Sequence, residues 1–152
     1  MTERVAIVEL HRVNGAFDVS VPGYERDWWS DLGWAMSAQP KFLVAFVEDE
    51  EVARSVILEH KIQVPIADFD ARHPTLEISR FEVRGDRRRC GIGRAAVATL
   101  REMWPQHQLV VFSDQDGFWR RAGLMEHGRI GGVGHEPSIF VAKPLSQSPR
   151  RG

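Results

Sequence analysis

Strand and helix patterns alternate through the middle of the chain, and this alternation constrains the fold more than any other feature. Residues 75–83 have the apolar spacing of a strand, and residues 84–90 form a polar, basic connection. Residues 91–104 are rich in alanine and favour a helix that ends at Pro105. Residues 109–112 are a short apolar run of the kind found in buried strands. A strand, a crossover helix and a second strand predict a parallel pair of strands.

Further strands and helices are predicted on both sides of this unit. The predicted strands are residues 5–10, 41–48, 52–62, 127–130 and 138–142, and the predicted helices are 24–37 and 116–122. Because strands come first and then alternate with helices, we predict an α/β (α+β) fold with a mixed sheet and helices on both faces. No repeat or linker divides the chain. We expect one domain over residues 1–143 and a disordered tail over 144–152.

Composition limits the partners and the location that we expect. The 152 residues contain 20 Lys and Arg against 21 Asp and Glu, and this net charge of −1 argues against nucleic acid or an acidic membrane as a partner. The longest purely apolar run, residues 42–47, is far too short to span a membrane. The first residues carry no apolar signal-peptide core, so we expect a cytoplasmic protein. The single cysteine, Cys90, excludes an internal disulfide and a thiolate zinc site, and we expect no metal.

The chain is locally basic around the start of the alanine-rich helix. Six arginines and two acids lie within residues 80–94. Gly91 and Gly93 allow backbone N–H groups at this helix start to approach a ligand, and those groups carry the positive end of the helix dipole. An anion such as a pyrophosphate would accept hydrogen bonds from these N–H groups and balance the positive end of the dipole. Further positive charge there would come from Arg88, Arg89 and Arg94.

The residues alone leave other interpretations of this turn open. It could be a helix start beside a solvated basic loop, with no ligand at all. Gly91-x-Gly93-x-x-Ala96 also matches a dinucleotide fingerprint, and Asp114 follows about 20 residues later. That fingerprint turns directly off its strand, however, whereas here a seven-residue basic segment intervenes. The remaining chain is also too short for the rest of a doubly wound sheet.

Two motifs of this chain resemble one enzyme superfamily. The pattern Val83-x-Gly85-x-x-Arg88-x-x-Gly91-x-Gly93 resembles the acyl-CoA pyrophosphate loop of the GCN5-related N-acetyltransferase (GNAT) superfamily. The segment Phe-Trp-Arg-Arg-Ala-Gly-Leu at 118–124 resembles a second motif of the same superfamily. The resemblance covers residues 75–125. It implies a GNAT-like mixed sheet of about six or seven strands, splayed between strands 75–83 and 109–112, and acetyl-CoA or another acyl-CoA as co-substrate. The cofactor-binding residues that it implies are Phe81, Glu82, Val83, Arg88, Arg89, Cys90, Gly91, Ile92, Gly93 and Arg94.

The resemblance also suggests which residue deprotonates the amine. Glu77 stands where many relatives place a glutamate that acts as general base, so we expect it to be catalytic; the alternative is a strand carboxylate paired with an arginine. Strand alternation places Glu82 on the opposite face from Glu77. His60 is the next candidate. Trp119 stands where the superfamily usually has a tyrosine acid, so the departing thiolate would be protonated by water or Ser113, or leave unprotonated.

The sequence therefore predicts an acyl-CoA-dependent N-acyltransferase that acetylates an amine of a small molecule or peptide. The alternative is a catalytically degenerate acyl-CoA-binding sensor or interaction module, which the missing tyrosine favours. A nucleic-acid binder is disfavoured by the net charge and by the lack of aromatic residues within the arginine cluster. The predicted partners are an acyl-CoA and an amine, with no nucleic acid and no membrane, and the chain is expected to be a monomer or homodimer. The acceptor side would include Trp28, Trp29, Trp34, Met36 and residues 131–136, which do not identify the amine.

Overall fold

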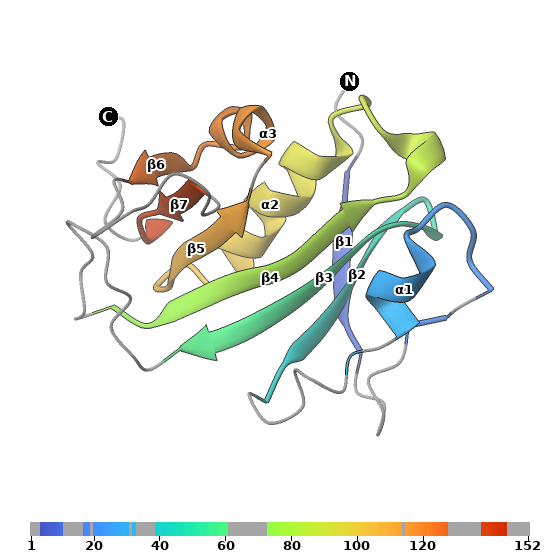
Figure 1. Cartoon of the computed structure of the whole chain (residues 1–152), viewed down its shortest axis with the longest axis horizontal. Helices are drawn as coiled ribbons and strands as arrows, with labels where there is room; N and C mark the ends of the chain where they lie inside the picture. Colours follow the sequence, from blue (N-terminus) through green and yellow to red (C-terminus); the bar gives the residue numbers. More distant parts are fainter. Residues whose placement is uncertain are drawn as a thin grey trace.

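The computed structural model describes residues 4–10, 17–18, 20–30, 32, 39–60, 73–113, 115–127 and 138–145. Within them, a seven-stranded sheet has the order β1-β2-β3-β4-β5-β7-β6 (Figure 1). The strands are Ala6–Glu9 (β1), Lys41–Val47 (β2), Glu50–His60 (β3), Thr75–Val83 (β4), Gln108–Ser113 (β5), Met125–His127 (β6) and Ser138–Ala142 (β7). The helices are Arg26–Ser30 (α1), Ile92–Met103 (α2) and Asp116–Arg121 (α3), and a short 3₁₀ helix, Gly85–Arg87 (η2), lies between β4 and α2.

Helices cover both faces of this sheet (Figure 1). On one face, Val97 and Leu100 of α2 and Trp119 of α3 join the largest hydrophobic cluster. On the other face, Trp29 of α1 packs in a cluster with Val56 of β3. Neighbouring strands are antiparallel except for the central pair, β4 and β5, which is parallel. The predicted mixed sheet with a parallel pair and helices on both faces is confirmed.

The sequence of α2 explains both its helicity and its docking. Alanines favour the helical backbone, and the buried residues of the helix recur three to four positions apart, so that one stripe faces the sheet. That stripe consists of Ile92, Gly93, Ala96, Val97 and Leu100. The Trp104 N–H bonds the Leu100 carbonyl at the C-terminal end, and Pro105 then prevents the helix from continuing.

Most predicted element bounds differ from the structure by one or two residues. The bounds of β4 and β7 were predicted correctly. The helix predicted over 24–37 is helical at Arg26–Ser30, and much of its remainder lies outside the described residues. The strand predicted over 127–130 is observed at Met125–His127, and residues 128–130 lie outside the described part of the chain.

The β2–β3 hairpin turns on two acidic residues in a strained backbone conformation. Glu48 and Asp49 have positive φ angles of 49° and 66°. Two consecutive left-handed residues form the mirror-image turn that matches the twist of a two-residue hairpin. Glycine and asparagine adopt this conformation most easily, so the turn retains a backbone cost that a different sequence would lower.

The parallel strands β4 and β5 separate after three paired positions. They pair at Thr75–Gln108, Leu76–Leu109 and Glu77–Val110. At the paired end, the Gln108 side-chain amide donates to the Thr75 hydroxyl at 3.0 Å and to the His73 carbonyl at 3.2 Å. Beyond Glu77, the β5-facing edge of β4 has no strand partner among the described residues. The sheet is therefore splayed at its centre, as the resemblance implied (Figure 1).

Candidate active site

The splay opens beside the N-terminus of α2. Gly91 is the N-cap of this helix with φ +78°, and Arg89 two residues earlier also has a positive φ of 64°. No side chain caps the helix start. The first amides of a helix have no partner within it and lie at the positive end of its dipole. Residues 89–94 thus present backbone N–H groups in an arrangement that suits an anion.

The two glycines of this turn have different structural roles. A Cβ at Gly91 would meet nothing within 4 Å, so its requirement for glycine comes from the positive φ alone. A Cβ at Gly93 would lie 2.5 Å from Cε2 of Phe118. Gly93 is therefore a packing contact between α2 and α3, whereas the sequence had suggested only close approach to a ligand.

Much of the local positive charge is neutralised inside the molecule. The Arg84 guanidinium is paired with Glu50 and Asp86, and these hydrogen bonds raise its pKa above the ordinary arginine value. Arg87 lies 3.6 Å from the same Glu50 carboxylate. Arg88 folds back onto β4: its Nη2 donates to Glu82 at 3.1 Å, and its Nε donates to a β4 carbonyl.

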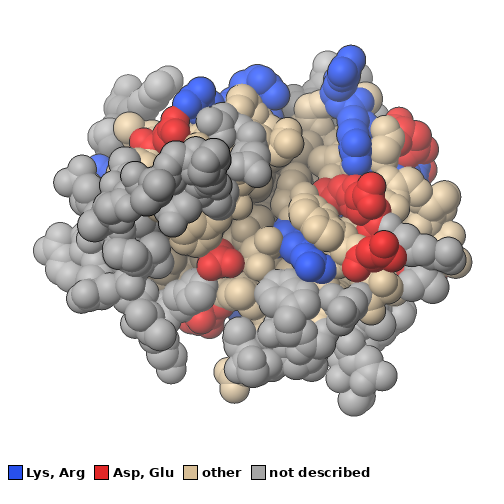
Figure 2. All heavy atoms as spheres, viewed as in Figure 1, with Lys and Arg blue, Asp and Glu red and all other residues tan. Residues whose placement is uncertain are grey.

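Two exposed arginines remain for a ligand at the α2 start. Arg89 and Arg94 have no ion-pair partner among the described residues. Figure 2 shows blue side chains on the surface over the loop that follows β4. The sequence treated Arg88 as equivalent to these two, but its side-chain contacts make it an anchor of the loop.

A β-bulge in β4 brings three charged residues to one face of the sheet. Val56 of β3 pairs with Arg80, and the next residue of β3 pairs with Ile78, so Ser79 is an extra residue in β4. The Ser55 hydroxyl donates to the Arg80 carbonyl beside this bulge at 2.8 Å. The extra residue shifts the alternation of side chains by one position.

The predicted orientation of Glu82 is therefore wrong. Glu77 pairs with Leu58, which packs in the hydrophobic cluster on the α1 side of the sheet. Glu82 pairs with Arg54, whose guanidinium lies over the ring of Tyr24. Both glutamates lie on the face of the sheet that α1 covers. Strand alternation alone predicted opposite faces, because it does not anticipate the bulge.

Glu77 occupies the last paired position before β4 and β5 separate. It is partly buried and lies between Leu58 of β3 and Val110 of β5. Its carboxylate is thus held on rigid strands at the inner end of the splay. His60, the alternative base, pairs with Thr75 through the backbone, and its side chain lies outside the described part of the structure.

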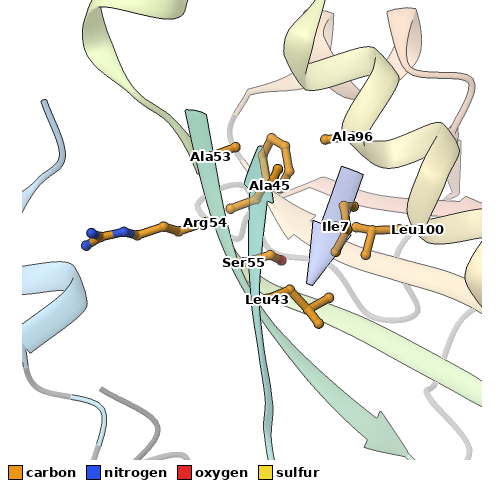
Figure 3. A pocket seen from close by; sticks show the side chains of 9 residues that line it. Ile7, Leu43, Ala45, Ala53, Arg54, Ser55, Ala96 and Leu100 are labelled. Carbon is orange, nitrogen blue, oxygen red and sulfur yellow. The ribbon is translucent and has the colours of Figure 1, made fainter. Parts of the chain in front are cut away.

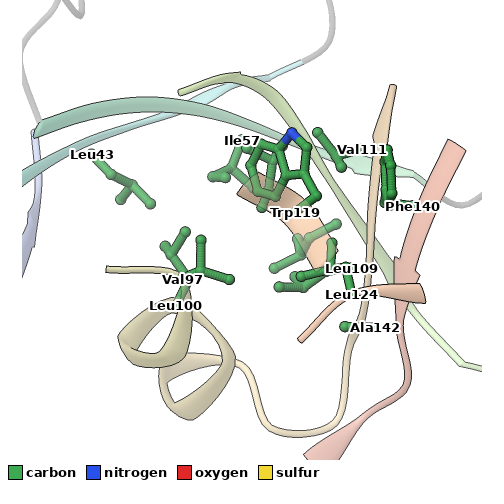
Figure 4. Packing of buried hydrophobic residues seen from close by; sticks show 12 residues of the cluster. Leu43, Ile57, Val97, Leu100, Leu109, Val111, Trp119, Leu124, Phe140 and Ala142 are labelled. Carbon is green, nitrogen blue, oxygen red and sulfur yellow. The ribbon is translucent and has the colours of Figure 1, made fainter. Parts of the chain in front are cut away.

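Aromatic side chains of β4 and α3 lie beside the splay. Phe81 stacks on Phe118 with ring centroids 5.7 Å apart, and Trp119 meets both rings edge to face at 5.8 and 4.8 Å. Trp119 is only 4% exposed and packs among core residues (Figure 4). The residue in the place of the superfamily's tyrosine is therefore a core aromatic.

Three other side chains carry a proton that could be donated: Ser113, Tyr24 and Cys90. The Ser113 hydroxyl accepts a hydrogen bond from the Gln115 amide at 3.0 Å. Tyr24, the single tyrosine of the chain, lies 4.1 Å from the Arg54 guanidinium carbon, and burial raises its pKa above the ordinary value. Cys90 is exposed in the loop, with its thiol 3.5 Å from the Arg88 carbonyl oxygen.

A small cavity lies between α2 and the sheet, lined mainly by residues of β1, β2 and β3 (Figure 3). It is about large enough for one water molecule, too small for a substrate. The Arg54 side chain points away from it, towards the α1 side of the sheet (Figure 3). Its lining includes Ile7, Leu43, Phe81, Ala96 and Leu100.

Among the described residues, no group of three or more His, Cys, Asp or Glu side chains could hold a metal ion. None of the described helices is long and apolar enough to cross a bilayer.

Solved structures match this fold, although no known protein-family profile and no curated protein matches the sequence. A mutant of the toxin AtaT bound to acetyl-CoA and to the C-terminus of the antitoxin AtaR has a TM-score of 0.64 and 12% identity, over 95% of this chain and 95% of that chain. AtaT complexed with acetyl-methionyl-tRNAfMet has a TM-score of 0.66 and 11% identity, over 93% and 96%. The N-acetyltransferase YlbP of Bacillus subtilis, in complex with coenzyme A, has a TM-score of 0.62 and 15% identity, over 92% and 97%.

These neighbours are GNAT-fold acetyltransferases, and this chain has the GNAT fold. The resemblance identified from residues 75–125 is thus confirmed for the fold, and it extends over almost the whole chain. At 10–15% identity the likeness concerns architecture, so activity has to be argued from the site.

The prediction that excluded nucleic acid as a partner is wrong. Structures with this fold include the KacTA–DNA complex and an AtaT–AtaR complex bound to DNA, with TM-scores of 0.62 and 0.61, besides AtaT with acetyl-methionyl-tRNAfMet. Net charge averages over the whole molecule, whereas nucleic acid responds to local charge. In this chain, three arginines are exposed at the start of α2 despite the net charge of −1: Arg88, Arg89 and Arg94.

Sequence reasoning missed the residues that connect α1 to this site. The resemblance implied that Glu82 binds the cofactor, but it did not predict that the Glu82 carboxylate contacts both Trp29 of α1 and Arg88. Its contacts to Trp29 and Glu25 span 53 and 57 residues of chain. Because no local pattern encodes such distant contacts, a single sequence carries no signal for them.

Proposed function

We propose that this chain is an acyl-CoA-dependent N-acetyltransferase that moves an acetyl group from acetyl-CoA to an amine of a small molecule or a macromolecule. One observation carries the proposal: β4 separates from β5 after Glu77, and the uncapped start of α2 follows the open end of β4. Structures of this fold in complex with acetyl-CoA or coenzyme A support it. From the sequence arguments, we also propose that residues 1–143 form a single acyl-CoA-binding domain and that it acts in the cytoplasm.

The acyl-CoA would lie along β4 with its pyrophosphate at the α2 start. The pantetheine arm would pair with the unpartnered edge of β4 at Phe81–Val83, as an added strand does. The amides of residues 89–94 would bind the pyrophosphate, with Arg89 and Arg94 adding charge. Glu82 and Cys90 would take part through their backbone, and Arg88 by holding the loop.

The reaction needs a base and a good leaving group. The amine must lose a proton to attack the thioester carbonyl, and Glu77 is proposed to accept that proton, directly or through a water. The C–S bond then breaks and the coenzyme leaves as a thiolate. Because an ordinary thiol has a pKa of about 8.5, the thiolate can leave without a dedicated acid, which fits the core position of Trp119.

One observation favours a second candidate function. Trp119 is buried where the superfamily usually places a tyrosine acid, so the chain could bind acyl-CoA without turnover, as a sensor or interaction module. The two candidates share the cofactor site and differ in chemistry. Binding with turnover defines the enzyme, and binding without turnover defines the sensor.

Ligand-dependent unfolding and thiol release test this proposal together. Acetyl-CoA at a hundredfold excess over Kd should add about 2.7 kcal/mol of stability, which raises Tm by roughly 5–11 °C for a chain of this size. NAD and ATP should raise Tm much less, because this fold is not a dinucleotide-binding fold. Free thiol from acetyl-CoA should then appear with at least one acceptor from a panel of small amines, peptides and aminoacyl-tRNA. A shift with NAD and none with coenzyme A would contradict the proposal.

A further inference from the structure

The Glu82 carboxylate is a junction between two separate parts of the site. It is 8% exposed and accepts hydrogen bonds from α1 and from the loop before α2. From the α1 side, the Trp29 indole N–H donates to its Oε1 at 2.7 Å and the Glu25 backbone N–H at 3.0 Å. From the loop side, Arg88 Nη2 donates to its Oε2 at 3.1 Å.

The surroundings of Glu82 meet the needs of a buried carboxylate. A buried carboxylate is costly unless donors satisfy it, and here three donors converge on one group. The bulge at Ser79 is what turns Glu82 to the α1 side of the sheet. Arg88 is fixed from a second direction, because its Nε donates to the Val83 carbonyl at 3.1 Å. Its side chain therefore connects the loop to β4 and α1.

We propose that Glu82 is a positioning residue that couples acyl-CoA binding to the ordering of α1. The inference rests on the proposed function, since it needs the pyrophosphate to bind the amides of residues 89–94. Binding there fixes the loop that carries Arg88, fixed Arg88 holds the Glu82 carboxylate, and the carboxylate holds the first turn of α1. Coupling of this kind is reciprocal, so an ordered α1 also favours acyl-CoA binding.

The consequence concerns the acceptor side of the site. Trp28 of α1 is 44% exposed, and the centroid of its ring lies 5.5 Å from the guanidinium carbon of Arg80. The Arg80 guanidinium also donates a hydrogen bond to the Trp28 carbonyl. Arg80 shares the α1-covered face of β4 with Glu77. The position of α1 thus shapes the surface next to the proposed base. Acyl-CoA binding would therefore help to order the acceptor side.

Hydrogen exchange at α1, with and without coenzyme A, tests the coupling. In the wild type, saturating coenzyme A should slow amide exchange at residues 89–94 and also at residues 25–30, the latter about fivefold or more. In Glu82→Gln and Arg88→Gln, the loop should still be protected at saturation while α1 no longer responds. Arg89→Gln is the matched control: it removes the same charge one residue away without touching Glu82, so it should weaken coenzyme A binding, yet α1 should still respond once coenzyme A is saturating.

Each outcome decides the inference. If the loop is protected and α1 exchange is unchanged or faster in the wild type, the coupling is refuted while the proposed function stands. If coenzyme A neither binds nor protects the loop, the proposed function itself fails. An Arg89→Gln variant that loses the α1 response as Arg88→Gln does would show a general charge effect and also refute the coupling. Should Glu82→Gln fold poorly, Arg88→Gln still gives the answer, because that side chain is 56% exposed.

Discussion

The contact between Gly93 and Phe118 makes a quantitative prediction about the junction of α2 and α3. In Gly93→Ala, the new Cβ would lie 2.5 Å from Cε2 and 2.9 Å from Cζ of Phe118. The ring has little room to move, since it stacks on Phe81 and meets Trp119. Overpacking of this kind costs about 1–3 kcal/mol, whereas alanine regains up to about 1 kcal/mol of helix propensity over glycine. The net loss is then up to about 2 kcal/mol, or roughly 4–8 °C in Tm.

Urea and thermal unfolding of a small set of variants measure this loss. Phe118→Leu shortens the side chain that the new methyl meets, so the double variant should lose about 1 kcal/mol less than the sum of the two single changes. Gly91→Ala is the control. It meets nothing within 4 Å and pays only the left-handed backbone cost, about 1–2 kcal/mol, which Phe118→Leu should not relieve. A stabilising Gly93→Ala, or equal rescue of both alanines by Phe118→Leu, would refute the packing argument.

Three further predictions follow from individual residues. Glu77→Gln should lower kcat by roughly 10²–10³ with the Kd for acetyl-CoA nearly unchanged, and full activity with the same acidic limb in the pH–rate profile would place the base elsewhere. Asp49→Gly should stabilise the fold by about 1 kcal/mol in urea unfolding, because Asp49 has a φ of 66° in the hairpin turn, and destabilisation would contradict that backbone assignment. Tyr24→Phe should raise stability by about 1 kcal/mol, since the buried hydroxyl has no hydrogen-bond partner among the described residues and phenylalanine keeps a ring beside Arg54; a loss of stability would show that the hydroxyl is bonded.

The sequence predicted the architecture because regular periodicity encodes it. The apolar spacing in residues 75–83 and the short apolar run within 138–142 predicted the bounds of β4 and β7, and the glycine turn before an alanine-rich stretch predicted the start of α2. Those signals are local. Helix propensity, capping and apolar spacing act within a few residues, so a single sequence contains them.

The details of the site depended on contacts between distant residues. The bulge at Ser79 leaves no sequence pattern, yet it decides which face Glu82 occupies. The arginine cluster was interpreted as charge available to a ligand. In the structure, Arg84 is paired with Glu50, which lies 34 residues earlier on β3, and Arg88 is paired with Glu82. Which arginines face solvent is therefore a property of the folded sheet and not of the composition.

The central claim is that an acyl-CoA binds along β4 with its pyrophosphate at the start of α2, and a crystal structure of the chain with acetyl-CoA tests it most directly. We expect pyrophosphate oxygens within hydrogen-bond distance of amides between Arg89 and Arg94, the pantetheine arm paired with Phe81–Val83, and the thioester near Glu77 at the inner end of the splay. A complex in which acetyl-CoA lies elsewhere, with the edge of β4 and the amides at the α2 start unoccupied, would contradict it.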